Sequence, residues 1–259
     1  MADAQGPALN EGAAADGDWR AIVERVSHAY RAADAHAARF ARSKLLRDPV
    51  FRHLLQQGLI PPRATVLDLG CGQGLLAGCL AAAADAQRRE CWPATWGPAP
   101  MDASLVGLDL SEAQLRRADA IRLEAAHFVP ADMRNAVFPE CDVVACIDTL
   151  HYLPLADQDN VLLRARNALR PGGVLLLRVG DASAPIRWRL GLWIDCITRW
   201  VQGGGFEPVY GRSVASWRFV LNRLGLEVEC LPMNGRLPFV NQLLVARRPI
   251  APRDVEPTT

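Results

Sequence analysis

The sequence of 259 residues lacks several features that would identify a functional class at once. No uninterrupted apolar run approaches the roughly 20 residues that a membrane span requires. The net charge is only +1, so the charge balance gives no support for nucleic acid as a partner. Residues 1–18 are small and polar and lack the apolar core of a secretory signal, so we expect a cytoplasmic protein.

The cysteines also lack a recognisable pattern. There are seven of them, and none stands in a Cys-x-x-Cys pair. An odd, scattered set fits reduced thiols better than disulfides or a zinc site, and we expect no bound metal. Cys71 lies inside a glycine-rich segment, where a small residue that fits the turn is a simpler interpretation than a nucleophile.

Apolar residues, in contrast, are plentiful. Half of the residues are hydrophobic, which is enough for one packed α/β domain. We predict a disordered tail over 1–18, a single domain over 19–248 and a C-terminal tail over 249–259. Within the domain, residues 19–58 are predicted to form a cap of two helices, and residues 186–217 a second cap that is rich in tryptophan.

The most informative segment is residues 66–74, which place one acid, Asp68, before Gly70, Gly72 and Gly74. The apolar run 65–69 predicts a buried strand, and an alanine-rich helix is expected over 75–86. A strand, a glycine turn and a helix N-terminus together let the backbone approach a ligand closely. A dinucleotide fingerprint, Gly-x-Gly-x-x-Gly, would need its third glycine one residue later than it stands here.

Acidic residues also follow the next strands. A strand predicted over 104–110 contains Asp109 near its end, where an acid can accept hydrogen bonds from both hydroxyls of a ribose. Short strands over 127–129 and 142–147 lead to Asp132 and Asp148. The stretch 88–103, which separates the first two strands, is rich in proline and aperiodic and is interpreted as an inserted loop.

Turn signals and apolar runs complete the pattern. A helix over 155–169 is followed by Arg170-Pro171-Gly172-Gly173, which predicts a helix stop and a tight turn. Further strands are predicted over 174–179, 227–231 and 240–246.

The order and spacing of these pieces resemble the class I methyltransferases that depend on S-adenosylmethionine (SAM). The resemblance covers about 60–247. It implies a Rossmann-like α/β fold with a seven-stranded mixed sheet, an antiparallel last strand and helices on both faces. It also implies SAM as the cofactor and no metal. The cofactor-binding residues that it implies are Asp68, Gly70, Cys71, Gly72, Gly74, Asp109, Leu110, Asp132, Met133 and Asp148.

A narrower resemblance is carried by residues 44–49, by residues 178–182 and by Met233 with residues 238–241. These segments are similar to bacterial small-molecule methyltransferases of aryl-polyene and polyketide or fatty-acid-like pathways. The similarity implies a small-molecule acceptor, free or bound to a carrier protein, and no nucleic acid.

His151 follows the fourth predicted strand, on the carboxyl edge where open α/β sheets bind ligands. It is the best-placed general base if the acceptor is a hydroxyl, although a histidine at this place more often packs or orients than abstracts a proton. Tyr152, Trp188 and Trp193 are candidates for binding an aromatic or lipid-like acceptor, although a tryptophan stripe is more often core.

Tyr30, Phe40, Arg42 and Lys44 precede the first strand, in a segment that often lies over the cofactor in this fold class. They are interpreted either as lining the pocket or as an amphipathic helix with a solvated basic face.

Two other classes of protein stay open. An NAD(P)-dependent oxidoreductase is disfavoured by the absent third glycine and has no need of Asp132 and Asp148. A catalytically silent SAM-fold binding protein is disfavoured by the intact Asp68, the loop glycines and Asp109.

Overall fold

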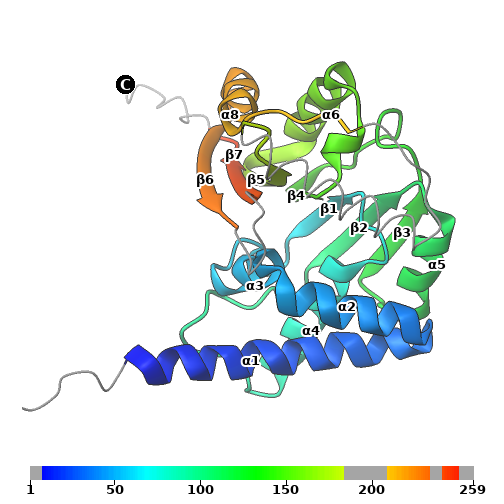
Figure 1. Cartoon of the computed structure of the whole chain (residues 1–259), viewed down its shortest axis with the longest axis vertical. Coiled ribbons are helices and arrows are strands. Elements are labelled where there is room, and N and C mark those ends of the chain that lie inside the picture. The colour runs from blue at the N-terminus through cyan, green and yellow to red at the C-terminus, as the bar shows by residue number, and fades with distance from the viewer. Residues whose placement is uncertain (1–7, 184–208, 234–240, 251–259) are drawn as a thin grey trace, which may run out of the picture. The chain divides into compact units, whose positions relative to one another are not determined.

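The computed structural model describes residues 8–183, 209–233 and 241–250 (Figure 1). Seven strands form one mixed sheet in the order β3-β2-β1-β4-β5-β7-β6. The chain divides into two compact units, Met1–Ala131 and Asp132–Thr259. This strand order is typical of the Rossmann-like methyltransferase fold, so the predicted fold class is confirmed.

The strands of the first unit are all parallel. β1 (Thr65–Leu69) pairs with β2 (Ser104–Asp109), which pairs in turn with β3 (Ala126–Pro130). In the sequence, α4 (Leu75–Arg88) follows β1 and α5 (Glu112–Ala120) follows β2. Because parallel strands need helical crossovers, this alternation of strand and helix is what the apolar runs and glycine turns predicted.

The segment before β1 is more helical than predicted. It contains α1 (Ala8–Ala29), η1 (Tyr30–Ala32), α2 (Ala35–Arg47) and α3 (Pro49–Gln56), and α1 packs against both α2 and α4 (Figure 1). The helix starts at Ala8, so the prediction of a disordered tail through residue 18 is wrong from Ala8 onward. Alanine, the strongest helix former, is frequent over 8–15 and explains the extension.

A proline divides the second predicted helix into α2 and α3. Asp48 has extended backbone (φ −102°, ψ 117°) and its side chain accepts a hydrogen bond from the Val50 N–H at 3.1 Å. Pro49 stands at the first turn of α3, where its missing N–H costs nothing and its ring disfavours helical backbone in Asp48.

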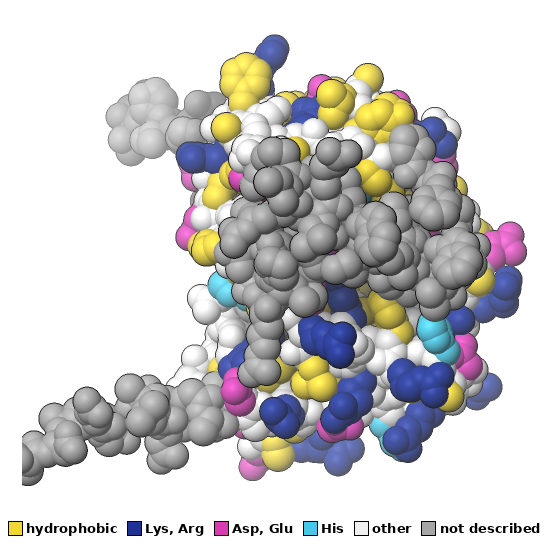
Figure 2. Space-filling view, in the orientation of Figure 1, with side chains coloured by type: hydrophobic (Ala, Val, Ile, Leu, Met, Phe, Trp, Pro, Cys, Tyr) yellow, Lys and Arg dark blue, Asp and Glu magenta, His cyan; other side chains and the backbone are white. Residues whose placement is uncertain are grey.

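Basic side chains on α2 lie on the surface, as Figure 2 shows over this part of the molecule. The Arg42 side chain is 54% exposed and pairs with Glu24 at 2.8 Å, and Lys44 pairs with Asp48 at 2.7 Å. These contacts agree with the interpretation of a solvated basic face. Tyr30, in contrast, is fully buried.

The insertion between α4 and β2 is ordered. Trp92 and Trp96 meet edge to face with ring centroids 5.1 Å apart, and the Trp92 Nε1–H donates to the Gly97 carbonyl at 2.9 Å. The Gly97 N–H in turn donates to the Gln56 carbonyl at 2.8 Å. The proline-rich loop therefore packs against the end of α3.

The second unit contains the rest of the sheet. β4 (Cys141–Ile147) pairs in parallel with β5 (Leu169–Gly180), and β7 (Asn241–Arg247) runs antiparallel to both β5 and β6 (Glu227–Pro232). The predicted antiparallel last strand is thus confirmed. β5 begins at Leu169, five residues before the predicted strand, because a register shift between Cys141 and Val143 lets the chain pair before the Pro-Gly-Gly turn as well as after it.

Within the described part of this unit, three helical elements accompany the strands: η2 (Leu150–Tyr152), α6 (Leu155–Ala168) and α8 (Val214–Arg223). Most of the predicted cap over 186–217, including Trp188 and Trp193, lies outside the described residues. Trp217, at its end, is 1% exposed in α8 and belongs to the core. Among the described residues, no helix is long and apolar enough to cross a membrane.

Two glycines make room for one aromatic ring in the first unit. A Cβ atom on Gly74 would lie 2.8 Å from the Phe128 ring, and one on Gly107 would lie 2.8 Å from both that ring and the Cys71 Sγ. Phe128 belongs to β3 and pairs with Gly107 of β2. Gly74 is therefore required by packing, whatever else the loop does.

We expect Gly107→Ala to destabilise the protein by about 1–3 kcal/mol, because the added methyl group overpacks the contact among Cys71, Phe128 and β2. Urea unfolding measures the effect. Gly17→Ala is the matched control: Gly17 lies within α1 with no atom within 4 Å of a new Cβ. The control should gain up to about 1 kcal/mol from helix propensity. Equal stability changes in the two variants would contradict this packing argument.

Candidate functional site

The glycine loop between β1 and α4 holds three residues in the left-handed region: Gly70 (φ 72°), Gly72 (φ 54°) and Gly74 (φ 77°). The N–H groups of Gly70 and Cys71 donate to the Leu108 carbonyl at 2.8 and 3.1 Å, which seats the loop on β2. A Cβ atom on Gly72 would meet no atom within 4 Å. The backbone at Gly72 thus borders open space that a ligand can enter.

Asp109, at the end of β2, is bound to this loop. Its Oδ2 accepts a hydrogen bond from the Gly72 N–H at 2.8 Å, and its Oδ1 accepts one from the Ser111 N–H at 2.8 Å. Each carboxylate oxygen can accept a second hydrogen bond. Asp109 is therefore able to hold the loop and to receive two hydroxyl groups at the same time.

Asp68 is the second acid of the first unit and is only 4% exposed. Burial raises the pKa of its carboxyl to about 7, and the nearby charge of Asp109 adds to the increase. Among the described residues, none donates a hydrogen bond to this carboxylate. A buried carboxylate beside a second one favours a positively charged ligand group.

Leu110 and Cys71, two other predicted cofactor-binding residues of the first unit, differ in exposure. Leu110 follows Asp109 and is 68% exposed, so it presents an apolar side chain next to the acid. Cys71 is 8% exposed, and burial raises the pKa of its thiol far above the ordinary range. A protonated, packed thiol agrees with the interpretation of Cys71 as a small residue that fits the turn.

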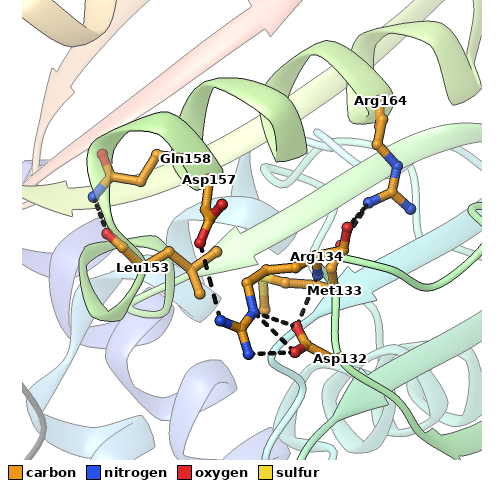
Figure 3. Close-up of polar contacts among 7 residues, drawn as sticks. All are labelled: Asp132, Met133, Arg134, Leu153, Asp157, Gln158 and Arg164. Carbon is orange, nitrogen blue, oxygen red and sulfur yellow. Dashed lines mark hydrogen bonds and ion pairs between the residues drawn. The ribbon is translucent and has the colours of Figure 1, made fainter.

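In the second unit, Asp132 is held by its own neighbour. The Arg134 Nε–H donates to Asp132 Oδ2 at 2.8 Å and its Nη2–H at 2.6 Å, and the Arg134 N–H donates to Oδ1 at 2.9 Å (Figure 3). The Arg134 guanidinium lowers the pKa of Asp132. Asp132, one of the predicted cofactor-binding residues, is therefore an ionised group that already has one cationic partner.

Arg164 of α6 fixes the backbone around this acid. It donates to the Met133 carbonyl at 2.9 Å and to the Arg134 carbonyl at 2.7 Å (Figure 3), and its guanidinium lies 4.3 Å from the Phe138 ring centroid. The loop that carries Asp132 and Met133 is consequently tied to α6 by Arg164 and also by the ion pair between Arg134 and Asp157 at 4.0 Å (Figure 3).

Asp148 follows β4 and has a positive φ of 57°. Its carboxylate forms an ion pair with Arg178 of β5, which is 5% exposed. This ion pair therefore joins the ends of β4 and β5. A buried arginine of this kind needs its carboxylate, because an uncompensated buried charge is strongly unfavourable.

The turn that carries His151 is buried and tightly anchored. His151 is 5% exposed, and its ring centroid lies 4.2 Å from that of Tyr152. The Tyr210 N–H donates to the His151 carbonyl at 2.7 Å, and the Gln158 Nε2–H₂ donates to the carbonyls of Leu153 and Tyr210, both at 2.9 Å. The backbone at Tyr210, near the end of the predicted cap, is therefore hydrogen-bonded to this turn and to α6.

Several residues of these sites were missed in the sequence. Arg178 interrupts the apolar run of β5, and Gln158 shares the buried face of α6 with Val161, Leu162 and Ala165. A charged or amide side chain on an otherwise buried face is a signal that could have singled out both. No comparable signal marks Arg164 or Tyr210.

Residues 67–175 match the profile of a protein family described as a methyltransferase domain. This segment, less than half of the chain, contains the glycine loop, Asp109 and the His151 turn. The match agrees with the predicted resemblance to methyltransferases over this segment.

A carboxy-S-adenosyl-L-methionine synthase from Shewanella amazonensis is 32% identical over 123 residues, covering 46% of this chain and 45% of the relative. The chain thus spans less than half the length of this curated relative.

Solved structures agree on the fold. An O-methyltransferase family protein from Burkholderia thailandensis superposes with a TM-score of 0.57 at 22% identity, covering 85% of this chain and 62% of that chain. A magnesium protoporphyrin IX methyltransferase from Synechocystis with bound S-adenosylhomocysteine (SAH) gives 0.53 at 18% identity, covering 95% and 90%. At such identities the likeness shows the shared fold.

The raised pKa of Asp68 makes stability depend on pH. An unfolded aspartate titrates near pH 3.9, so between about pH 4 and pH 7 the folded chain keeps a proton that the unfolded chain has lost. Stability therefore falls as pH rises through this window. Asp68→Asn should remove this loss.

The unfolding free energy of Asp68→Asn, measured in urea, should exceed that of the wild type by an amount that grows from pH 4 to pH 8, up to a few kcal/mol. Asp34 and Asp132 have lowered pKa values and act in the opposite direction, but both are present in the two proteins and cancel. A difference that stays constant with pH would mean that Asp68 titrates as an ordinary aspartate.

Proposed function

We propose that this protein is an enzyme that uses SAM to methylate a small-molecule acceptor, namely a hydroxyl group of a phenolic, aromatic or lipid-like compound. The observation that carries the proposal is the glycine loop with its two acids. It combines a buried carboxylate, an open space at Gly72 and a strand-end carboxylate with free accepting capacity.

Each feature matches a part of SAM. The ligand carries a sulfonium and an ammonium group, and both are suited to a site that contains Asp68 and Asp109. The ribose hydroxyls are suited to the remaining lone pairs of Asp109. SAM has no phosphate, which agrees with a loop that departs from the pyrophosphate-binding spacing. Asp132, Met133 and Asp148 are assigned to the cofactor by resemblance.

SAM supplies an activated methyl group. The acceptor oxygen forms a bond to the methyl carbon as the carbon–sulfur bond breaks, the electron pair stays on sulfur as SAH leaves, and the hydroxyl proton passes to a base. No protein nucleophile is needed, so alignment and desolvation provide much of the rate. The burial of His151 and the anchored turn that carries it support a role for this residue on the acceptor side.

A second candidate function follows from the relatives that are named carboxy-S-adenosyl-L-methionine synthases. In that case SAM itself would be modified: its methyl carbon would lose a proton and form a bond to a carboxyl carbon, which a second substrate bearing a carboxyl group would give up. Mass analysis of the nucleoside product separates the two functions. Methyl transfer yields SAH, whereas the alternative yields a nucleoside that retains the methyl-derived carbon and gains a carboxyl group.

We expect SAM and SAH to bind one site in titration calorimetry, and NAD(H) not to bind. Gly72→Val should abolish SAM binding, because a branched side chain fills the open space beside the loop. Gly225→Val is the matched control, since Gly225 also has positive φ (74°) and open space around it but lies between α8 and β6. It should lose similar stability and still bind SAM. Tight NAD(H) binding without SAM binding would overturn the proposal.

His151→Ala should lower methyl transfer to a hydroxyl acceptor by about 10²–10⁴-fold if His151 is the base, with SAM affinity unchanged. Turnover of labelled SAM is measured against phenolic and acyl-carrier-bound acceptors, with mass analysis of the product. His127→Ala, which removes an exposed histidine of β3, serves as the control and should retain full turnover. Near-normal turnover of the His151→Ala enzyme on its true acceptor would show that His151 is not the base. The rate would then come from the alignment of the acceptor with the methyl group.

A further inference from the structure

The helical segment before β1 meets the glycine loop at one corner, formed by residues 30–37. This corner comprises η1, the turn at Ala33 and Asp34, and the first residues of α2. It lies outside the segment 67–175 that matches the methyltransferase profile. Its contacts nevertheless reach the part of the loop that borders the open space.

Two buried hydrogen bonds join the corner to Gln73, the residue between Gly72 and Gly74. The Tyr30 hydroxyl donates to the Gln73 carbonyl at 2.5 Å, and the Gln73 Nε2–H₂ donates to the Ala37 carbonyl at 3.1 Å. Tyr30 is fully buried and Gln73 is 3% exposed. Both the backbone and the side chain of Gln73 are therefore held by the corner.

The corner is itself held on two other sides. The Tyr30 ring packs beside Gly78 of α4, where a Cβ atom on the glycine would lie 3.7 Å from the ring, an ordinary van der Waals distance. On the other side, the Arg117 Nε–H of α5 donates to Asp34 Oδ2 at 3.0 Å, and Asp34 also caps α2. The corner thus connects the helix that follows the glycine loop with the helix that follows Asp109.

We propose that residues 30–37 position the glycine loop for SAM, with Tyr30 and Gln73 as positioning residues. This inference rests on the proposed function. The loop contains three left-handed residues and gains its shape from contacts outside itself: Asp109 holds the N–H of Gly72, and Tyr30 holds the carbonyl of Gln73. A loop that is ordered before binding loses less conformational entropy when the ligand arrives.

The burial of Tyr30 supports this role chemically. Burial raises the pKa of its hydroxyl well above the ordinary value, so the group stays protonated and remains a donor to the loop carbonyl at any pH of interest. The fully buried hydroxyl has no access to solvent or to a ligand. Tyr30 therefore acts through the loop rather than on SAM.

The test compares Tyr30→Phe with a matched control, Trp19→Phe, in the full-length protein. Trp19 of α1 donates from Nε1 to the Leu45 carbonyl of α2 at 3.1 Å. Each variant removes one buried hydrogen bond that a side chain of the N-terminal helical segment donates to a backbone carbonyl. The acceptor is the Gln73 carbonyl of the glycine loop for Tyr30 and the Leu45 carbonyl of α2 for Trp19, so only Tyr30→Phe releases the loop. Calorimetry measures SAM affinity, and hydrogen–deuterium exchange measures protection over residues 66–78.

Tyr30→Phe should weaken SAM binding by about 3- to 10-fold, the effect of one lost hydrogen bond, and speed exchange in the loop. Trp19→Phe should destabilise the protein with SAM affinity within about two-fold of wild type. Gln73→Met keeps the length of the side chain and removes its hydrogen-bond donor, so it should weaken SAM binding to a similar extent. If the Tyr30→Phe protein does not fold, the Gln73→Met protein serves as the test instead.

The outcomes separate this inference from the proposed function. Wild-type protein that does not bind SAM would overturn both. Wild-type protein that binds SAM, together with Tyr30→Phe and Gln73→Met proteins that bind it equally well, would overturn only the role of the corner. Equal losses of affinity in Trp19→Phe and Tyr30→Phe would also overturn it, because the effect would then be one of general stability.

Discussion

The hydrogen bond from the Gly72 N–H to the Asp109 carboxylate is the contact on which the candidate site depends. It joins the loop after β1 to the end of β2 at 2.8 Å, and a bond of this type to a charged acceptor contributes roughly 1.5–3 kcal/mol. The pairing of β1 with β2 places Asp68 opposite Gly107, two residues before Asp109. One backbone contact therefore holds the loop and the two acids in a common arrangement, and the left-handed φ of Gly72 is compatible with it.

The same arrangement explains why ionisation of Asp68 is unfavourable in the free protein. Asp68 is buried near Asp109, and neither burial nor the neighbouring carboxylate favours its ionised form. Such an arrangement is stabilising only when a cation binds. Strain of this electrostatic kind is common at functional sites, where the environment suits the ligand rather than the free protein. A structural interpretation of Asp68 would instead require a donor from the protein, and the described residues supply none.

Much of the fold was predictable because its signals are local. Apolar runs, the glycine turn at 70–74 and the stop at Pro171 each depend on a few adjacent residues, and the strand order then follows from the class of fold. The start of α1 at Ala8 was missed because small polar residues resemble a tail, although alanine favours a helix. The resemblance to SAM-dependent methyltransferases placed Asp68, Gly72 and Asp109 in one predicted site, whereas the sequence did not indicate the partners of Asp132 and Asp148. Arg134 and Arg178 lie two and thirty residues away, and only tertiary structure shows which acid each arginine binds.

Gly74 shows that the sequence of a glycine motif does not by itself reveal why each glycine is needed. It is one of three glycines that suggested a cofactor loop, yet a side chain there would strike Phe128 of β3 and Ala118 of α5. Gly72, two residues earlier, faces open space and has no such packing constraint. Both have positive φ, so backbone conformation alone does not distinguish them. The distinction comes from what surrounds each Cβ position: Gly74 lets β3 and α5 pack against the loop, and Gly72 leaves the space that a ligand needs. The motif thus contains a position that packing fixes and a position that borders open space, and we expect the two to respond differently to substitution.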